Sequence, residues 1–264
     1  MIPNKIIIIG SGASIRQGLW DTPIEELPIW EAVKNQFTIS CNWSFKWVDP
    51  TISMFCDHRF YCLEKEHLDK LPILLTAKKN GFYNDERKYK KYFDKIGDNL
   101  HFLKVCGGVK YKEHTDVIHN GVNTQLGGIY TPQLTGLMAI GYALSIGCKE
   151  LYLLGFDAGA SQGRTHFYEG DKEHTGIVNW NNQTQTGVGL DANGRCKNDN
   201  YNEDINWWFH PLTNNDADVK IYNVSPESNI TVFPKISFSE FYKVYTTNKK
   251  IDQRILQEEL ERLL

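Results

Sequence analysis

Residues 5–14 read KIIIIGSGAS, in which four isoleucines precede two glycines separated by one serine. A short run that is apolar on both faces is typical of a buried parallel strand. Glycine permits a tight turn and a close approach of the backbone to a ligand, and the amides that follow can hold phosphate oxygens. Gly10 and Gly12 are therefore candidate ligand-binding residues at the end of a strand.

The sequence matches two common phosphate-binding patterns only in part. The dinucleotide pattern has a third glycine where this chain has Ile15, and an acidic residue at the end of the second strand, where this chain has Asn42. The triphosphate pattern needs G-K-[ST], and no lysine follows the glycines. A glycine turn that binds no ligand stays open as the alternative.

Apolar runs alternate with helix-like stretches along the chain. The longest helix pattern, residues 132–146, ends at Gly147 and leads directly into an apolar strand at residues 151–154. This alternation predicts an α/β fold, a doubly wound, mostly parallel Rossmann-like sheet with a polar lid insertion and a C-terminal helix. Further strands are expected at residues 5–9, 37–41, 52–56, 73–76, 100–105 and 219–224.

The organisation predicted is one nucleotide-binding α/β domain, residues 1–157 and 201–245, interrupted by an insertion. Residues 158–200 are rich in Gly, Asn, Gln, Thr and Asp. A polar insertion of this length is typical of a disordered loop or of a lid, and we interpret it as a lid that contacts the acceptor. Residues 246–264 carry leucine and isoleucine at near-helical spacing. This tail predicts a C-terminal helix that packs on the core or forms an oligomer contact.

Composition restricts the classes of function. The chain has 264 residues, 41% hydrophobic and 23% charged, with a formal net charge of −3, which argues against a broad nucleic-acid surface without excluding a local one. No apolar run approaches the roughly 20 residues of a membrane span, so we expect a cytoplasmic protein. The six cysteines form no C-x-x-C pair and are interpreted as reduced. The Lys- and Asn-rich composition is typical of an AT-rich genome, such as that of a phage.

Polar residues follow several predicted strands. Asn42 ends the second strand, Asp57, His58 and Arg59 end the third, and Asp157 ends the late strand. In an open parallel sheet these positions share one edge with the glycine turn, where ligands bind. Each residue alone is explained as a helix cap or turn residue, but together they predict a binding site. The neutral amide of Asn42 suits a base, a phosphate or a sugar hydroxyl.

Four blocks of the sequence resemble the CMP-sialic-acid-dependent bacterial sialyltransferases. The blocks are IIIIGSGAS at 6–14, the strand that ends in Asn42, TGLMAIGYALSIGCKELYLLGFD at 135–157, and VKIYNVSPESNITVFPKIS at 219–237. They are equally similar to the wider superfamily, which includes proteins like hydroxymethylpterin pyrophosphokinase. The resemblance implies a nucleotide-binding sheet with a lid.

The resemblance also implies roles for individual residues. The donor phosphate is expected at the turn from Gly10 to Ser14, against Ser11 and Gly12, and at the N-terminus of the helix that begins near Thr135. The other donor-binding residues implied are Asn42 and Asp57 on the donor side, Thr135 and Gly136 at the helix start, Asp157 at the nucleotide ribose or base, and Ser225 and Ser228 in the last turn.

The chain departs from the family in two places. Residues 130–136 read YTPQLTG, without the arginine that the family places before a TSG-like motif to meet the sugar carboxylate. After Asp157 the sequence AGAS replaces an aromatic pair. A tyrosine that assists departure of the phosphate is therefore expected elsewhere, at Tyr168.

Transfer of a sugar to a hydroxyl group needs a general base, and histidine titrates near neutrality. The segment GRTHFYEGDKEH, residues 163–174, supplies His166 as first candidate and His174 as second, and His210 is the third. Arg164 is a candidate for neutralising a leaving phosphate.

A metal ion is the other means of helping a phosphate to leave. The sole D-x-D sequence, residues 216–218, precedes its strand and so lies at the wrong end of the sheet. Asp57 and Asp157 could hold Mg²⁺ if they converge. We expect a metal-independent glycosyltransferase with a nucleotide-sugar donor, of CMP type, and a glycan or other hydroxyl acceptor, and no cofactor. The alternatives are a Mg-ATP-dependent pyrophosphokinase of the pterin type and a non-catalytic nucleotide-binding module.

Overall fold

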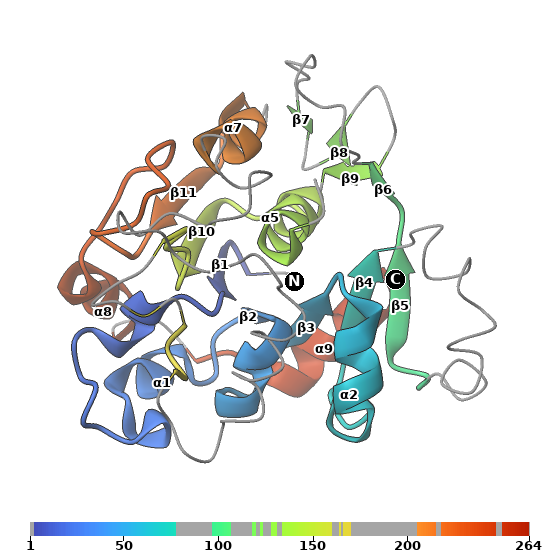
Figure 1. The fold of residues 1–264 in the computed structure, drawn as a ribbon. Coiled ribbons are helices and arrows are strands. Elements are labelled where there is room, and N and C mark those ends of the chain that lie inside the picture. Colours follow the sequence, from blue (N-terminus) through green and yellow to red (C-terminus); the bar gives the residue numbers. More distant parts are fainter. Residues whose placement is uncertain are drawn as a thin grey trace.

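A computed structural model gives the fold, and its main feature is a seven-stranded sheet (Figure 1). The order is β11-β10-β1-β2-β3-β4-β5, and every neighbouring pair is parallel. The strands are β1 Lys5–Ile9, β2 Thr38–Cys41, β3 Ile52–Phe55, β4 Leu74–Ala77, β5 Leu100–Leu103, β10 Glu150–Leu154 and β11 Lys220–Asn223. The structure describes residues 3–77, 97–106, 118–119, 122–123, 128–130, 134–159, 164, 166–169, 205–214, 218–246 and 250–263.

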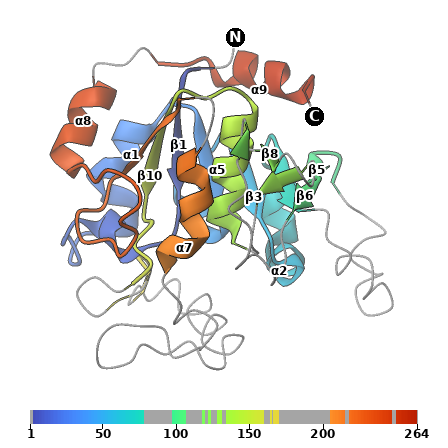
Figure 2. The same cartoon turned by 90° about the horizontal axis from the view of Figure 1, so that it is seen from above.

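Helices cover both faces of the sheet, so the predicted doubly wound Rossmann-like fold is confirmed. Along β1, Ile6 and Ile8 enter one core cluster, and Ile7 and Ile9 enter the other, because successive side chains of a strand point to opposite faces. The first cluster is covered by α5 (Thr135–Ser145), α7 (Ile205–Phe209) and α9 (Gln253–Glu261). The second is covered by α1 (Pro28–Val33), α2 (His58–Leu68) and α8 (Phe238–Thr246). Figure 2 shows α1 and α8 on one side of β1 and β10, with α5 and α7 on the other.

A second, smaller sheet was not predicted. It has the order β6-β9-β8-β7, with strands β6 Val105–Cys106, β7 Ile118–His119, β8 Val122–Asn123 and β9 Gly128–Tyr130. Strands of two or three residues are too short to show an alternating pattern, which explains why the sequence did not reveal them.

The predicted C-terminal helix is present as α9. Asp252 caps it by accepting hydrogen bonds from the amides of Arg254 and Ile255. Leu256 and Leu260 are buried in the core. The helix therefore packs on the domain, which is one of the two arrangements predicted from the sequence. The oligomer contact stays a prediction.

Two further expectations concern the cysteines and the absence of a membrane-spanning helix, and both can be compared with the described part of the chain. The cysteines described there as free thiols are Cys41, Cys56, Cys62 and Cys148. Among the helices of the described residues, none is both long and apolar enough to cross a membrane. The proposed insertion, residues 158–200, lies mostly outside the described residues.

Candidate functional site

The strand order reverses between β1 and β10. From β1 the sheet continues through β2 on one side and through β10 on the other. In open parallel sheets, ligands bind outside the carboxyl ends of the strands at such a reversal of strand order. We call this region the carboxyl edge. The turns after β1, β2, β3, β10 and β11 and the start of α5 all belong to it.

The glycine turn after β1 packs directly against the turn after β10. The amide of Gly10 donates to the carbonyl of Leu154 at 2.8 Å, and that of Gly12 donates to Gly155 at 2.9 Å. A Cβ atom on Gly12 would lie 2.5 Å from Asp157 Oδ2 and 2.6 Å from the carbonyl oxygen of Gly155. The glycines therefore allow two loops to touch, and these two amides are used inside the protein. The expectation that amides of this turn hold phosphate is not met at Gly10 and Gly12.

Asp157 joins the two turns through Ser14. Its carboxylate accepts the Ser14 amide at 2.8 Å and the Ser14 hydroxyl at 2.5 Å. Burial raises the pKa of Asp157, the two Ser14 bonds and the nearby Ser225 hydroxyl oppose that rise, and the charge of Glu227 adds to it. The Ser225 hydroxyl is buried and makes no hydrogen bond of normal geometry, so it acts on Asp157 as a nearby dipole.

The raised pKa of Asp157 predicts a pH dependence of stability. Because the folded protein binds this proton more tightly than the unfolded chain, the contribution is fully present below the ordinary aspartate pKa of about 3.9 and is lost as the pH rises through the raised value. Urea unfolding of the wild type and of Asp157→Asn at pH 4 to 7 measures this. The stability of the wild type relative to the variant should fall as the pH rises, and a constant difference would contradict the assignment.

The turn after β11 is pinned to the turn after β10 by Ser228. Its hydroxyl donates to the carbonyl of Phe156 at 2.6 Å and accepts from the side-chain amide of Asn223 at 2.9 Å. Ser228 is 3% exposed. It therefore positions the turn that carries Ser225 and is not itself presented at the surface.

Asn42 and Thr135 meet across the carboxyl edge. The Thr135 hydroxyl donates to Asn42 Oδ1 at 3.2 Å, which links the end of β2 to the first turn of α5. Asn42 has a φ of 51°, a left-handed conformation that asparagine tolerates better than most residues. A Cβ atom on Gly136 would lie 2.6 Å from the Phe156 ring, so glycine lets α5 approach the turn after β10. Asp57 follows β3, one strand beyond Asn42.

His166 lies beside the glycine turn. Its backbone forms an antiparallel bridge with Gly12, and the next amide, of Phe167, donates to the carbonyl of Ser11 at 3.1 Å. The buried Arg16 donates from Nε to the carbonyl of Phe167 at 2.7 Å. The structure thus places His166, the first candidate for the general base, beside the strand ends that carry the other predicted residues.

The other predicted lid residues have different positions. Arg164 lies over the ring of Trp20, 4.2 Å from its centroid, and donates to the carbonyl of Glu169 at 2.7 Å. Tyr168 is 1% exposed and stacks on Trp47 at 5.6 Å, so it belongs to the core and is a poor candidate for contacting a phosphate. His210 is exposed at the start of a 3₁₀ turn. His174, and the side chains of His58 and Arg59, lie outside the described residues.

Sequence reasoning missed two residues of this edge. The Ser44 hydroxyl donates to the carbonyls of Ile9 and Cys41, both at 2.8 Å, and so joins the ends of β1 and β2. Glu169 accepts from His166, and its place three residues after that histidine is the signal that could have revealed it.

Asp57 and Asp157, the Mg²⁺ ligands of the pyrophosphokinase alternative, do not follow neighbouring strands. Asp57 follows β3 and Asp157 follows β10, and these strands are three positions apart in the sheet. Neighbouring strands are separated by about 4.8 Å, so the ends of β3 and β10 lie about 14 Å apart. One Mg²⁺ needs its ligands at about 2.1 Å. In the described part of the chain, no three His, Cys, Asp or Glu side chains form a metal-binding cluster.

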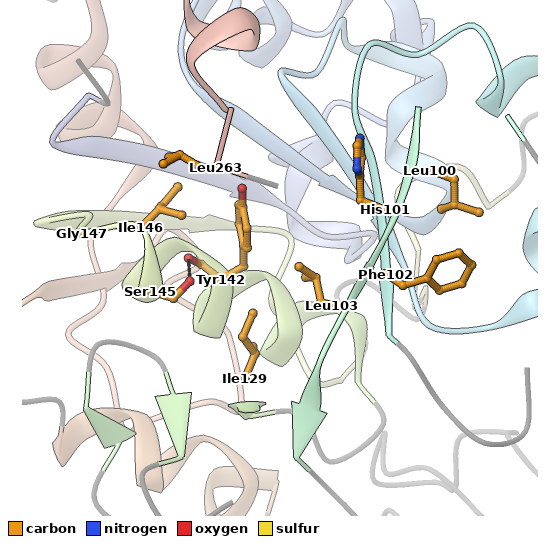
Figure 3. A pocket seen from close by; sticks show the side chains of 10 residues that line it. All are labelled: Leu100, His101, Phe102, Leu103, Ile129, Tyr142, Ser145, Ile146, Gly147 and Leu263. Atoms are coloured by element: carbon orange, nitrogen blue, oxygen red, sulfur yellow. Dashed lines mark hydrogen bonds between the residues drawn. The ribbon is translucent and has the colours of Figure 1, made fainter. Parts of the chain in front are cut away.

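A mainly apolar hollow of about 880 Å³ lies elsewhere, between β5 and the C-terminal end of α5 (Figure 3). Leu263, after α9, also lines it. The hydroxyl of Tyr142 is buried without a hydrogen-bond partner, and burial raises the pKa of this tyrosine to about 12. The residues lining this hollow do not include the predicted site residues.

Comparisons with known proteins concern the fold. The sequence matches no protein-family model, and no curated protein is significantly similar to it. The MAf glycosyltransferase from Magnetospirillum magneticum AMB-1 has a similar structure, with a TM-score of 0.53 and 13% identity over 98% of this chain and 36% of that chain. This chain thus spans about a third of that protein.

Two sialyltransferase structures are more distant. CST-II with bound CMP, in an asparagine-to-alanine variant, has a TM-score of 0.45 and 15% identity over 88% of this chain and 86% of that chain. CstII from Campylobacter jejuni, in complex with the substrate analogue CMP-3FNeuAc, has a TM-score of 0.43 and 15% identity over 88% of this chain and 85% of that chain. The comparison that shows a shared fold is the one with the Magnetospirillum magneticum protein, at 13% identity.

Proposed function

We propose that this protein is a glycosyltransferase that moves a sugar from a nucleotide-activated donor, of CMP type, to an acceptor hydroxyl. The observation that carries the proposal is the position of His166, whose backbone pairs with Gly12 at the carboxyl ends of β1 and β10. A base at the carboxyl edge of such a sheet suits a transfer that removes one proton from the acceptor.

The donor-binding residues supported by the geometry are those at the carboxyl edge. Asn42 and Thr135 are linked to each other, and Ser14 and Asp157 are linked to each other, at the two sides of β1. Ser11 would lie nearest to the donor phosphate, because the segment containing His166 crosses the glycine turn there. The CMP type of donor rests on the resemblance of the sequence blocks to the CMP-dependent sialyltransferases. The fold shared with the glycosyltransferase from Magnetospirillum magneticum is compatible with this proposal.

The pyrophosphokinase alternative is less well supported. It needs Mg²⁺ between Asp57 and Asp157, and these residues follow strands that are three positions apart.

A thermal-shift screen tests the proposal. The protein is heated with CMP, UDP, GDP, ADP or ATP, each with and without Mg²⁺, because a ligand that binds only the folded state raises its apparent stability. Stabilisation by CMP that is unaffected by EDTA, followed by release of CMP from a CMP-sugar with an acceptor, supports the proposal. Stabilisation by ATP with Mg²⁺ alone would favour the pyrophosphokinase. Nucleotide binding without turnover of any nucleotide-sugar would favour a non-catalytic module.

A further inference from the structure

The imidazole ring of His166 is held by a carboxylate. His166 Nδ1 lies 3.0 Å from Glu169 Oε1, and the same oxygen accepts the backbone amide of His166 at 3.2 Å. The amide of Glu169 in turn donates to the carbonyl of His166 at 3.2 Å. The carboxylate and the histidine therefore belong to one closed turn, which sets their separation locally.

Contacts from other parts of the chain fix this turn. Arg16 donates to the carbonyl of Phe167, and Arg164 donates to the carbonyl of Glu169, both at 2.7 Å. The His166 ring stacks on the buried Tyr168 with centroids 5.1 Å apart. The side chains of His166 and Glu169 are each 26% exposed. Tyr168 sets the plane of the ring, and Glu169 sets its rotation.

This arrangement selects one tautomer. A neutral imidazole has one donor nitrogen and one acceptor nitrogen, and an ionised carboxylate only accepts. Nδ1 must therefore carry the proton that Glu169 accepts, which makes Nε2 the basic nitrogen.

We propose that Glu169 is a positioning residue for the transfer reaction, which holds His166 in the tautomer protonated on Nδ1 and stabilises the imidazolium that forms. This inference rests on the proposed function. The acceptor oxygen bonds to the anomeric carbon while the bond from that carbon to the donor phosphate breaks. The acceptor proton passes to Nε2 of His166, and the electron pair of the broken bond leaves with the nucleotide.

The test is Glu169→Gln, which preserves the shape of the side chain but lets it donate to Nδ1. We expect kcat to fall by about 10²–10⁴-fold, as for a base held in the wrong tautomer, with little change in KM for the donor. Two-bond ¹H–¹⁵N spectra of the ring should show Nδ1 protonated in the wild type and a shift toward Nε2 protonation in the variant.

The chain offers a matched control in His67, whose Nδ1 lies 3.1 Å from Glu64 Oε2 on α2. The ring signals of His67 should be the same in wild type and Glu169→Gln, and His67→Ala should keep the wild-type rate. If Glu169→Gln keeps both kcat and the wild-type tautomer while His166→Ala is inactive, the positioning role is wrong and the proposed function stands. If the wild type transfers sugar from no nucleotide donor, the proposed function falls, and this inference falls with it.

Discussion

Replacement of His166 with alanine is expected to lower kcat for sugar transfer by about 10²–10⁴-fold, the usual contribution of a general base. Nucleotide affinity, measured by calorimetry, should stay within about twofold, because the backbone contacts at Gly12 and Ser11 do not need the imidazole ring. Steady-state kinetics with a nucleotide-sugar and its acceptor measure the effect.

The control for this experiment is His67→Ala. His67 has a comparable contact with a glutamate but lies near the end of α2, away from the carboxyl edge, with 62% of its side chain exposed. It should transfer sugar at the wild-type rate. An unchanged kcat in His166→Ala would show that the base lies elsewhere, and His174 would become the next candidate.

Substitution of Gly12 by alanine is expected to have the largest effect on the fold of the site. Gly12 has an ordinary φ of −63°, so the cost is one of space. The new Cβ atom would meet a backbone carbonyl, that of Gly155, at 2.6 Å and the carboxylate of Asp157 at 2.5 Å. Overpacking of this kind costs about 2–3 kcal/mol. Because Asp157 must move, nucleotide affinity should also fall by at least about tenfold, as calorimetry would measure.

Gly147→Ala is the contrasting variant. A Cβ atom there meets nothing within 4 Å, but the residue has a φ of +86°, which costs about 1–2 kcal/mol for alanine. Both variants should unfold at lower urea concentration than the wild type, yet only Gly12→Ala should lose nucleotide affinity. Wild-type binding and stability in Gly12→Ala would show that the two loops do not need their close contact.

Much of the large sheet was predictable because several of its strands are apolar runs that can be recognised from their own sequence. Residues 5–9 were expected as a strand and form β1 with the same bounds, since an apolar run between polar residues has few alternatives. The helix expected at 132–146 is present as α5 from Thr135 to Ser145. The short strands β7 and β8 could not be predicted, because two residues show no period and depend on their partners.

The positions of the candidate residues at the carboxyl edge were predictable, but their contacts were less so. Parallel strands bring their carboxyl ends together, which is why Asn42 and Asp157 could be assigned to one edge from chain order alone. Whether a polar group faces a ligand or the protein depends on contacts between distant segments. Ser228 and Tyr168 are buried for this reason, and no local pattern distinguishes such a serine or tyrosine from an exposed one.

A backbone amide NMR titration of the protein with CMP tests directly whether the carboxyl edge binds a nucleotide. We expect the amides of Ser11, Asn42, Thr135, Asp157 and Ser225 to shift together with one dissociation constant, because these residues lie at the carboxyl edge of one sheet. Shifts confined to other regions, such as the hollow between β5 and α5, or no saturable shift with any nucleotide, would contradict it.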